Sequence, residues 1–118
     1  MRRRAVLVAA LTLVGARAAQ AHAILLDSTP AIGGTVPAGP IKFTFRYNSR
    51  IDRRRSRLLI TGPDKAQSIL PILDEGTDDI VFASATLSPG TYTIRWQVLA
   101  VDGHITRGDV PFTVGGAQ

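Results

Sequence analysis

Residues 92–100 read Tyr-Thr-Ile-Arg-Trp-Gln-Val-Leu-Ala, and apolar side chains stand at every second position from Tyr92 to Ala100. Because successive side chains of a strand point to opposite faces, this period of two predicts a strand with one buried face. Trp96 lies at its middle, and we expect this large ring in the core rather than on a binding surface. The same period recurs over residues 41–47 and 110–114, so the three segments predict an antiparallel sheet.

Shorter apolar runs predict further strands at residues 23–26, 57–61, 68–72 and 80–86. Clusters of glycine and proline separate these runs and predict turns, among them residues 37–40, 88–90 and 102–103. Sustained helical spacing is absent from the sequence. We therefore predict an all-β fold, a single Greek-key β-sandwich of the Ig-like kind with about seven strands.

The first 21 residues have the three-part layout of a secretory signal peptide. Three arginines follow Met1, residues 5–16 are apolar, and Ala19 and Ala21 supply the small side chains that a signal peptidase reads. The apolar run is too short to span a bilayer comfortably. We therefore predict a signal peptide at 1–21 and one periplasmic domain at 22–118, which is not membrane-spanning after cleavage. Both the Sec and the Tat export routes remain open.

The net charge of +5 suggests a nucleic-acid or membrane binder, but four of the 14 basic residues lie within the first 21 positions. The remaining chain is close to neutral, which argues against nucleic acid as a partner. One basic cluster remains, without interleaved aromatic residues. It either binds an anionic partner or is a solvated, charged edge, and we favour the solvated edge. The cluster consists of Arg50, Arg53, Arg54, Arg55 and Arg57.

Sulfur is absent from residues 22–118, because the chain has no cysteine and its only methionine is Met1. Thiolate metal sites, thiol redox chemistry and cysteine nucleophiles are therefore excluded. The chain has two histidines, His22 and His104. Cleavage after Ala21 would make His22 the first residue, and its α-amino nitrogen and imidazole could then chelate one metal ion.

The second histidine belongs to the triplet Asp102-Gly103-His104, which follows the longest predicted strand. A carboxylate and an imidazole at this spacing can face one ion from a turn. With His22 they supply nitrogen and oxygen ligands, a set that favours Cu(II), one ion per chain. Zn(II) accepts similar ligands in a tetrahedral arrangement. A turn with an uninvolved histidine remains the simpler interpretation of the triplet taken alone.

Three stretches resemble the CopC family of copper-resistance proteins. Residues 22–36 begin with a histidine and contain Ser-Thr-Pro-Ala-Ile-Gly, residues 87–96 read Leu-Ser-Pro-Gly-Thr-Tyr-Thr-Ile-Arg-Trp, and residues 101–108 read Val-Asp-Gly-His-Ile-Thr-Arg-Gly. The resemblance implies a periplasmic β-barrel-like sandwich that binds Cu(II) for sequestration, transport or resistance, without catalysis. It also implies His22 (amine and imidazole), Asp102 and His104 as ligands.

The resemblance implies a partner as well, an inner-membrane copper protein of the CopD type. Two departures from the family pattern matter. The methionine-rich Cu(I) site of some members is not possible here, because no methionine follows residue 1. Ser49 stands where the family commonly has a glutamate near the copper, so a carboxylate that orients the ligands is missing unless Asp27 or Asp52 replaces it.

Two other functions stay open. A histidine brace is also the copper site of lytic polysaccharide monooxygenases, so the chain could be a copper-dependent oxidase that acts on a glycan. Asp102 would then occupy a copper position that oxygen chemistry needs open, and seven aromatic residues are few for both a core and a flat glycan-binding face. A metal-free Ig-like structural module is the third interpretation.

Overall fold

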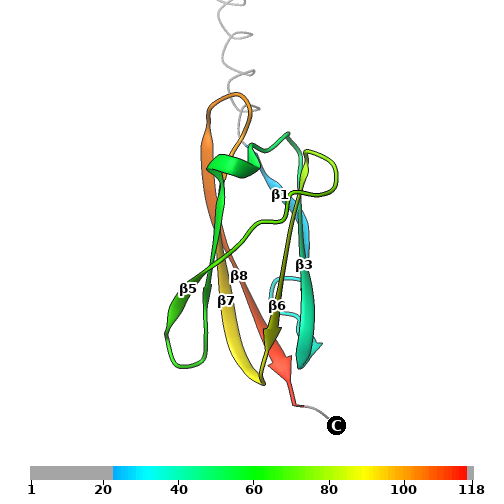
Figure 1. Ribbon diagram of the computed structural model, residues 1–118, viewed down its shortest axis with the longest axis vertical. Coiled ribbons are helices and arrows are strands. Elements are labelled where there is room, and N and C mark those ends of the chain that lie inside the picture. Colours follow the sequence, from blue (N-terminus) through cyan, green and yellow to red (C-terminus); the bar gives the residue numbers. More distant parts are fainter. Residues whose placement is uncertain (1–22, 117–118) are drawn as a thin grey trace, which may run out of the picture.

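The computed structural model describes residues 23–116, which fold into eight strands and one short 3-10 helix (Figure 1). The helix, η2, spans Arg53–Arg55. The strands are β1 (Leu25–Thr29), β2 (Thr35–Pro37), β3 (Gly39–Tyr47), β4 (Arg57–Thr61), β5 (Gln67–Leu70), β6 (Ile80–Leu87), β7 (Gly90–Leu99) and β8 (Ile105–Gly115). The predicted all-β fold is confirmed.

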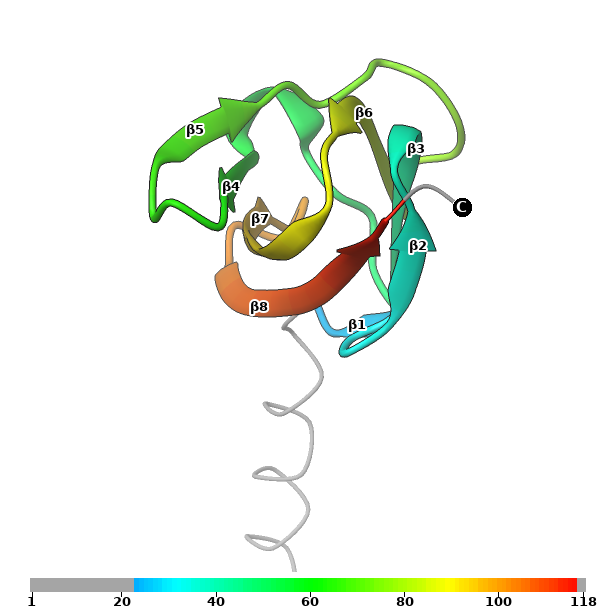
Figure 2. The same cartoon turned by 90° about the horizontal axis from the view of Figure 1, so that it is seen from below.

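The strands form two sheets that face each other, as the end view in Figure 2 shows. One sheet has the strand order β1-β3-β6, and the other has the order β2-β8-β7-β4-β5. The longest ladder joins β7 to β8 and runs from the pair Gly90–Val114 to the pair Leu99–Ile105. The predicted β-sandwich is therefore confirmed, with one strand more than the seven expected.

Strand β2 is the element that the sequence did not predict. It pairs in parallel with β8, whereas the other strand pairs of the described chain are antiparallel. Residues 37–40, expected to form a turn, instead contain the end of β2 and the start of β3. Pro37 lacks an N–H group, which is tolerated because β2 is the edge strand of its sheet.

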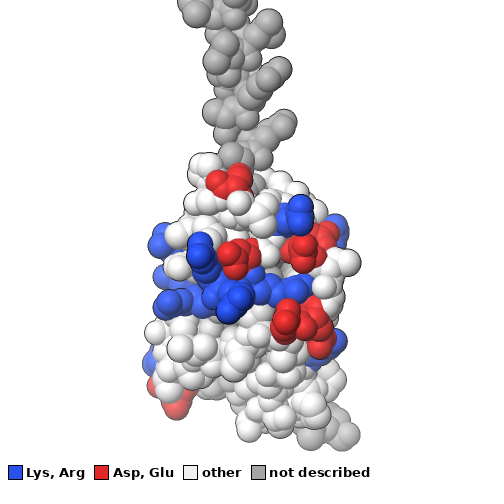
Figure 3. All heavy atoms as spheres, turned by 45° about the horizontal axis from the view of Figure 1, so that its top comes forward, with Lys and Arg blue, Asp and Glu red and all other residues white. Residues whose placement is uncertain are grey.

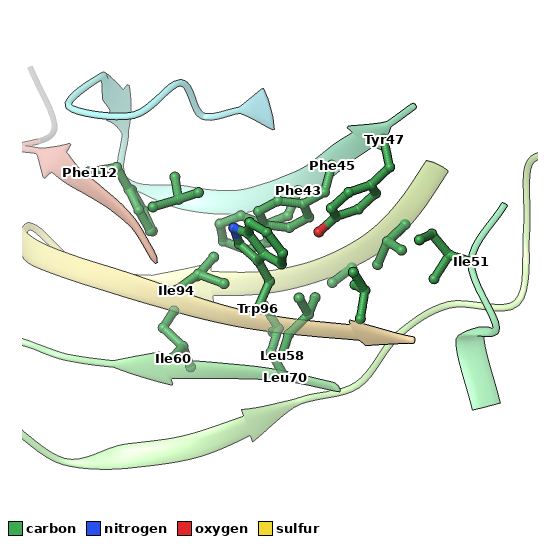
Figure 4. Close-up of a cluster of buried hydrophobic side chains, with 14 of the residues drawn as sticks. Phe43, Phe45, Tyr47, Ile51, Leu58, Ile60, Leu70, Ile94, Trp96 and Phe112 are labelled. Atoms are coloured by element: carbon green, nitrogen blue, oxygen red, sulfur yellow. The ribbon is translucent and has the colours of Figure 1, made fainter. Parts of the chain in front are cut away.

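The core lies between the sheets, where alternate side chains of β3, β7 and β8 meet (Figure 4). Trp96 is buried there, as the sequence predicts. Its indole contacts the ring of Tyr47 edge to face with centroids 5.3 Å apart, and Phe43 meets Phe112 in the same manner at 5.7 Å. Burial raises the pKa of the Tyr47 phenol well above its ordinary value, so this hydroxyl stays neutral.

Trp96 has room in this core because the residue opposite it on β8 is Gly108. A Cβ atom at position 108 would lie 2.4 Å from Cζ2 of the indole, far inside van der Waals contact. The glycine therefore lets the indole lie directly against the backbone of the neighbouring strand.

Candidate metal centre

The loop between β7 and β8 is a tight hairpin turn that carries two of the predicted ligands. The N–H of Gly103 donates to the carbonyl of Ala100 at 2.9 Å, and the N–H of Ala100 donates to the carbonyl of His104 at 2.9 Å. Gly103 has a φ of +96°, a conformation that glycine adopts without a steric penalty. The connection, residues 100–104, places Asp102 and His104 on either side of the glycine at the hairpin tip.

Asp102 and His104 are in direct contact at this tip. The Oδ1 atom of Asp102 accepts a hydrogen bond from the backbone N–H of His104 at 3.1 Å and lies 3.3 Å from Nδ1 of its imidazole. The His104 side chain is 48% exposed and that of Asp102 is 40% exposed. A carboxylate and an imidazole thus stand together at the surface, where a metal ion can reach both.

Hydrogen bonds hold residues 23 and 24, the first that the structure describes, beside this hairpin. Ala23 is buried, and its carbonyl accepts a hydrogen bond from Oγ1 of Thr106 at 3.0 Å, two residues beyond His104 on β8. The N–H of Ile24 donates to Oδ1 of Asn48 at 2.7 Å, and the N–H of Asn48 donates to the carbonyl of Ile24 at 3.1 Å. Residues 23 and 24 are therefore held from both sheets, and the first predicted strand, 23–26, begins only at Leu25.

His22, the remaining predicted ligand, lies outside the described residues. Within residues 23–116, no group of three or more His, Cys, Asp or Glu side chains is close enough to hold a metal ion. Of the three predicted ligands, the structure thus brings together Asp102 and His104. Ala23, the next residue after His22, lies beside the strand that follows His104.

Asn48 is a residue of this end of the domain that the sequence did not single out. It follows the last residue of β3 and pairs reciprocally with Ile24. An asparagine directly after a strand is typical of a turn, so its position alone does not distinguish it. Its amide offers both a donor and an acceptor, but no local signal indicates the pairing with Ile24.

Ser49 and the two carboxylates considered as its replacement lie near this end. Ser49 is half-buried and lines a shallow hollow of about 440 Å³ that also includes Asn48. Asp27 pairs with Arg46, whose Nε donates to Oδ2 at 3.0 Å, and this contact raises the pKa of the Arg46 guanidinium. The Oδ1 atom of Asp52 accepts from the first N–H groups of η2. Both carboxylates are therefore engaged in local structure.

The arginine cluster contains one residue that is not solvated. Arg53 is 15% exposed, and its Nη2 donates to the carbonyl of Gly76 at 2.9 Å and to that of Thr77 at 2.5 Å. The interpretation of the cluster as a solvated edge is therefore wrong for Arg53, because η2 turns its side chain into the loop before β6. Arg54, Arg55 and Arg57 are exposed, as that interpretation expects.

Two packed sheets with a histidine–carboxylate pair at one end define a small β-sandwich protein. The chain belongs to the CopC family, because the sequence pattern of the family, described as "CopC domain", matches residues 25–115. Protein YobA of Escherichia coli strain K12 is 38% identical over 99 residues, which are 80% of this chain and 79% of that protein. Copper resistance protein C of Pseudomonas syringae pv. tomato is 32% identical over 117 residues, covering 92% of this chain and 91% of that protein.

Solved structures agree with this assignment at the level of the fold. CopC from Methylosinus trichosporium OB3b matches with a TM-score of 0.73 and 23% identity, over 82% of this chain and 97% of that one. PcoC, a methionine-rich copper resistance protein from Escherichia coli, matches with a TM-score of 0.66 and 24% identity, over 80% and 99%. Membership of this family makes the chain a copper-binding or copper-resistance protein of a periplasmic family. In the described part of the chain, no helix has the length and apolar character that a membrane crossing needs.

Proposed function

We propose that the mature protein begins at His22, after cleavage of residues 1–21, and that it binds one Cu(II) ion in the periplasm. The ligands in this proposal are the α-amine and imidazole of His22, with Asp102 and His104. The ion is cargo, which the protein sequesters or carries in copper resistance, and an inner-membrane protein of the CopD type is the partner that receives or supplies it. The protein is a binding protein and performs no catalysis.

The observation that carries this proposal is the hydrogen bond from Thr106 to the carbonyl of Ala23. His22 directly precedes Ala23 in the sequence, so it is one residue along the chain from this contact. Thr106 is in turn two residues from His104. The bond therefore supports a site in which both histidines of the chain act on the same ion.

The chemistry of the ligand set supports copper in the oxidised state. An amine, two imidazoles and a carboxylate are hard or intermediate ligands, and Cu(II) stands at the top of the stability order for such sites. Binding displaces the proton of the amine, whose ordinary pKa of about 8 makes this step easy near neutral pH. The exposure of Asp102 and His104 supports entry and release of the ion without opening of the core.

The arrangement of the aromatic residues favours a carrier over a glycan oxidase. Five of the seven aromatic side chains are buried, and Phe82 and Tyr92 are half-buried. Lys42 lies over the ring of Phe82, and Tyr92 stacks on Phe112. The described surface thus offers no flat aromatic face for a polysaccharide, while Asp102 is well placed to fill a copper position.

The proposal is tested by removing each described ligand in turn. We expect His104→Ala and Asp102→Ala to lower Cu(II) affinity at least 10- to 100-fold, measured by competition with a chelator of known affinity. Both residues lie at an exposed turn, so the unfolding midpoint should change little. Asp64→Ala, in the turn between β4 and β5 at the far end of the domain, is the matched control and should bind copper normally. Normal binding by either ligand variant would remove that residue from the site.

Reduction of the bound ion should release it. Cu(I) prefers thiolate and thioether ligands, and residues 22–118 contain neither. We therefore expect a protein loaded with Cu(II) to transfer its copper to a modest Cu(I) chelator as soon as ascorbate is added. Retention of a full equivalent of Cu(I) under these conditions would contradict a site made of nitrogen and oxygen ligands alone.

Loss of the Asn48 side chain should weaken copper binding without removing a ligand. Asn48→Ala deletes the bond to the N–H of Ile24 and so loosens residues 23 and 24, which lead into the proposed ligand His22. We expect Cu(II) affinity to fall about threefold to tenfold, since a hydrogen bond of this kind contributes about 1 kcal/mol. Asn48→Asp keeps the acceptor and should retain most of the affinity. Equal losses in the two variants would show that the hydrogen bond does not matter for the site.

A further inference from the structure

The outer face of the five-stranded sheet carries a row of polar side chains close to the candidate metal centre. Arg57 on β4 is the cross-strand neighbour of Gln97 on β7, and Gln97 is the neighbour of Arg107 on β8. These side chains point away from the core, because the residues beside them on each strand face inward. The row lies next to the Leu99–Ile105 pair, where the hairpin with Asp102 and His104 begins.

Two further arginines lie beside this row. Arg54 and Arg55 belong to η2, which is fastened to the end of β7 by a hydrogen bond from the N–H of Asp52 to the carbonyl of Leu99 at 2.9 Å. Figure 1 shows η2 at the same end of the domain as the hairpin between β7 and β8. The four exposed arginines together are called the arginine surface here: Arg54, Arg55, Arg57 and Arg107.

The positive charges of the arginine surface are largely uncompensated within the described chain. No carboxylate of residues 23–116 lies within ion-pair distance of Arg54, Arg57 or Arg107. One row further along the sheet, by contrast, Arg95 holds Asp109 through two hydrogen bonds of 2.9 and 3.2 Å, and this contact lowers the pKa of that carboxyl. Figure 3 shows basic side chains in a band across one face of the domain, with acidic side chains beside and among them.

Apolar side chains are exposed at the same place. Val101, in the hairpin, is 61% exposed, and Ile105 is 51% exposed. Ile105 lies on the same face of β8 as Arg107, two residues away. Arg107 donates from Nε to Oε1 of Gln97 at 2.8 Å, and its charge has no carboxylate beside it. Solvent-exposed isoleucine and valine next to exposed arginines form the combination that protein interfaces favour, an apolar centre with arginine around it.

We propose that this end of the domain docks an acidic protein surface, with the arginine surface pairing with its carboxylates and with Val101 and Ile105 at the centre of the contact. The docking surface itself does not depend on copper binding. Its purpose rests on the proposed function, because a partner bound here would lie over Asp102 and His104, in position to exchange copper.

The geometry favours a protein over a phosphate group or a bilayer. Neighbouring strands are about 4.8 Å apart, so the backbones at Arg57 and Arg107, two strands apart, are separated by about 10 Å. That spacing suits two carboxylates on a folded surface and is wide for the oxygens of one phosphate, and arginine matches carboxylates by two parallel hydrogen bonds. A uniformly anionic bilayer would in addition meet the carboxylates of Asp52 and Asp102 at this end.

The test uses the full mature chain without metal and a 16-residue peptide of glutamates with three interspersed leucines. We expect the peptide to shift the amide resonances of residues 54–57, 97 and 101–107 in an NMR titration. The variant Arg57→Gln/Arg107→Gln should weaken binding about tenfold, since each exposed pair contributes modestly. Lys42→Gln/Lys65→Gln removes the same charge elsewhere and should change the dissociation constant less than twofold. Equal weakening by the two variants would overturn the proposal, because binding would then reflect net charge alone.

A second pair of variants tests the apolar part of the contact. Ile105→Ser should weaken peptide binding about threefold to fivefold, whereas Ile69→Ser, which replaces a 68% exposed isoleucine on β5, should have no effect. Binding to vesicles that contain phosphatidylglycerol, or to inorganic phosphate, in the absence of peptide binding would overturn the choice of an acidic protein. Cu(II) affinity of Arg57→Gln/Arg107→Gln should be unchanged. The two proposals are therefore tested separately. Absence of peptide binding would reject the docking surface but not the metal site, and absence of copper binding would reject the metal site but not the docking surface.

Discussion

Protein that begins at His22 should bind Cu(II) at least a hundred times more tightly than the same chain with one glycine added before His22. The added residue converts the α-amine of His22 into an amide, whose nitrogen is not basic and binds a metal ion only after it loses a proton. The amine and the imidazole of one residue then no longer close a chelate on the ion. Loss of a single supporting group at a metal site costs about 10- to 100-fold, and here a ligand and its chelate ring are lost together.

The comparison is made by chelator competition on the two proteins after the N-terminus of each has been verified by mass spectrometry. A chain with one glycine added after Gln118 is the matched control and should bind copper as the mature protein does. Equal Cu(II) affinity of the mature and N-terminally extended proteins would reject His22 as a bidentate ligand. Membership of the CopC family would stand in that case, because it rests on residues 25–115.

Replacement of Gly108 by alanine should clearly destabilise the described domain. Its Cβ would lie 2.4 Å from Cζ2, 2.6 Å from Cε2 and 2.9 Å from Nε1 of Trp96. The indole cannot move away without disturbing its contact with Tyr47, which is fully buried. Overpacking of this kind costs about 2–3 kcal/mol, so the urea midpoint should fall clearly.

Gly115→Ala is the matched control for this prediction. Gly115 lies on the same strand, and its added Cβ would meet atoms no closer than 3.8 Å. Its stability should therefore stay within about 0.5 kcal/mol of the unchanged protein. A second variant, Gly108→Ala/Trp96→Phe, replaces the indole by a smaller ring and should recover part of the loss when unfolding is followed by circular dichroism. A stable Gly108→Ala protein would show that β7 and β8 can separate to admit the methyl group.

The strands with a clear period of two were predictable, and so was the core that they form. Residues 41–47 and 110–114 lie within β3 and β8, and Trp96 is buried on β7. This success has a local cause, because alternation along one strand sets which side chains face inward whatever strand lies next to it. Strand β2 was missed because it has three residues, and because its last residue, Pro37, and the nearby Pro40 are typical of turns.

The candidate metal centre was predictable only as a list of residues. His22, Asp102 and His104 were singled out by the absence of sulfur, by the cleavage motif and by family resemblance. The contact between Asp102 and His104 is local, since a glycine separates them in one turn, and the structure shows it. The participation of His22 stays a prediction that the N-terminal extension tests.

What the amino-acid sequence determined by itself is the set of strands with one buried face, the tight turn at Gly103, and the ligand types that the chain can offer to a metal. Each of these depends on residues that are close along the chain. Only the tertiary structure decided that Thr106 holds Ala23, 83 positions earlier, that Asn48 pairs with Ile24, and that Arg53 is turned inward. Each of these contacts joins segments that are far apart along the chain, and the packing of the sheets decides which groups meet, which no local pattern encodes.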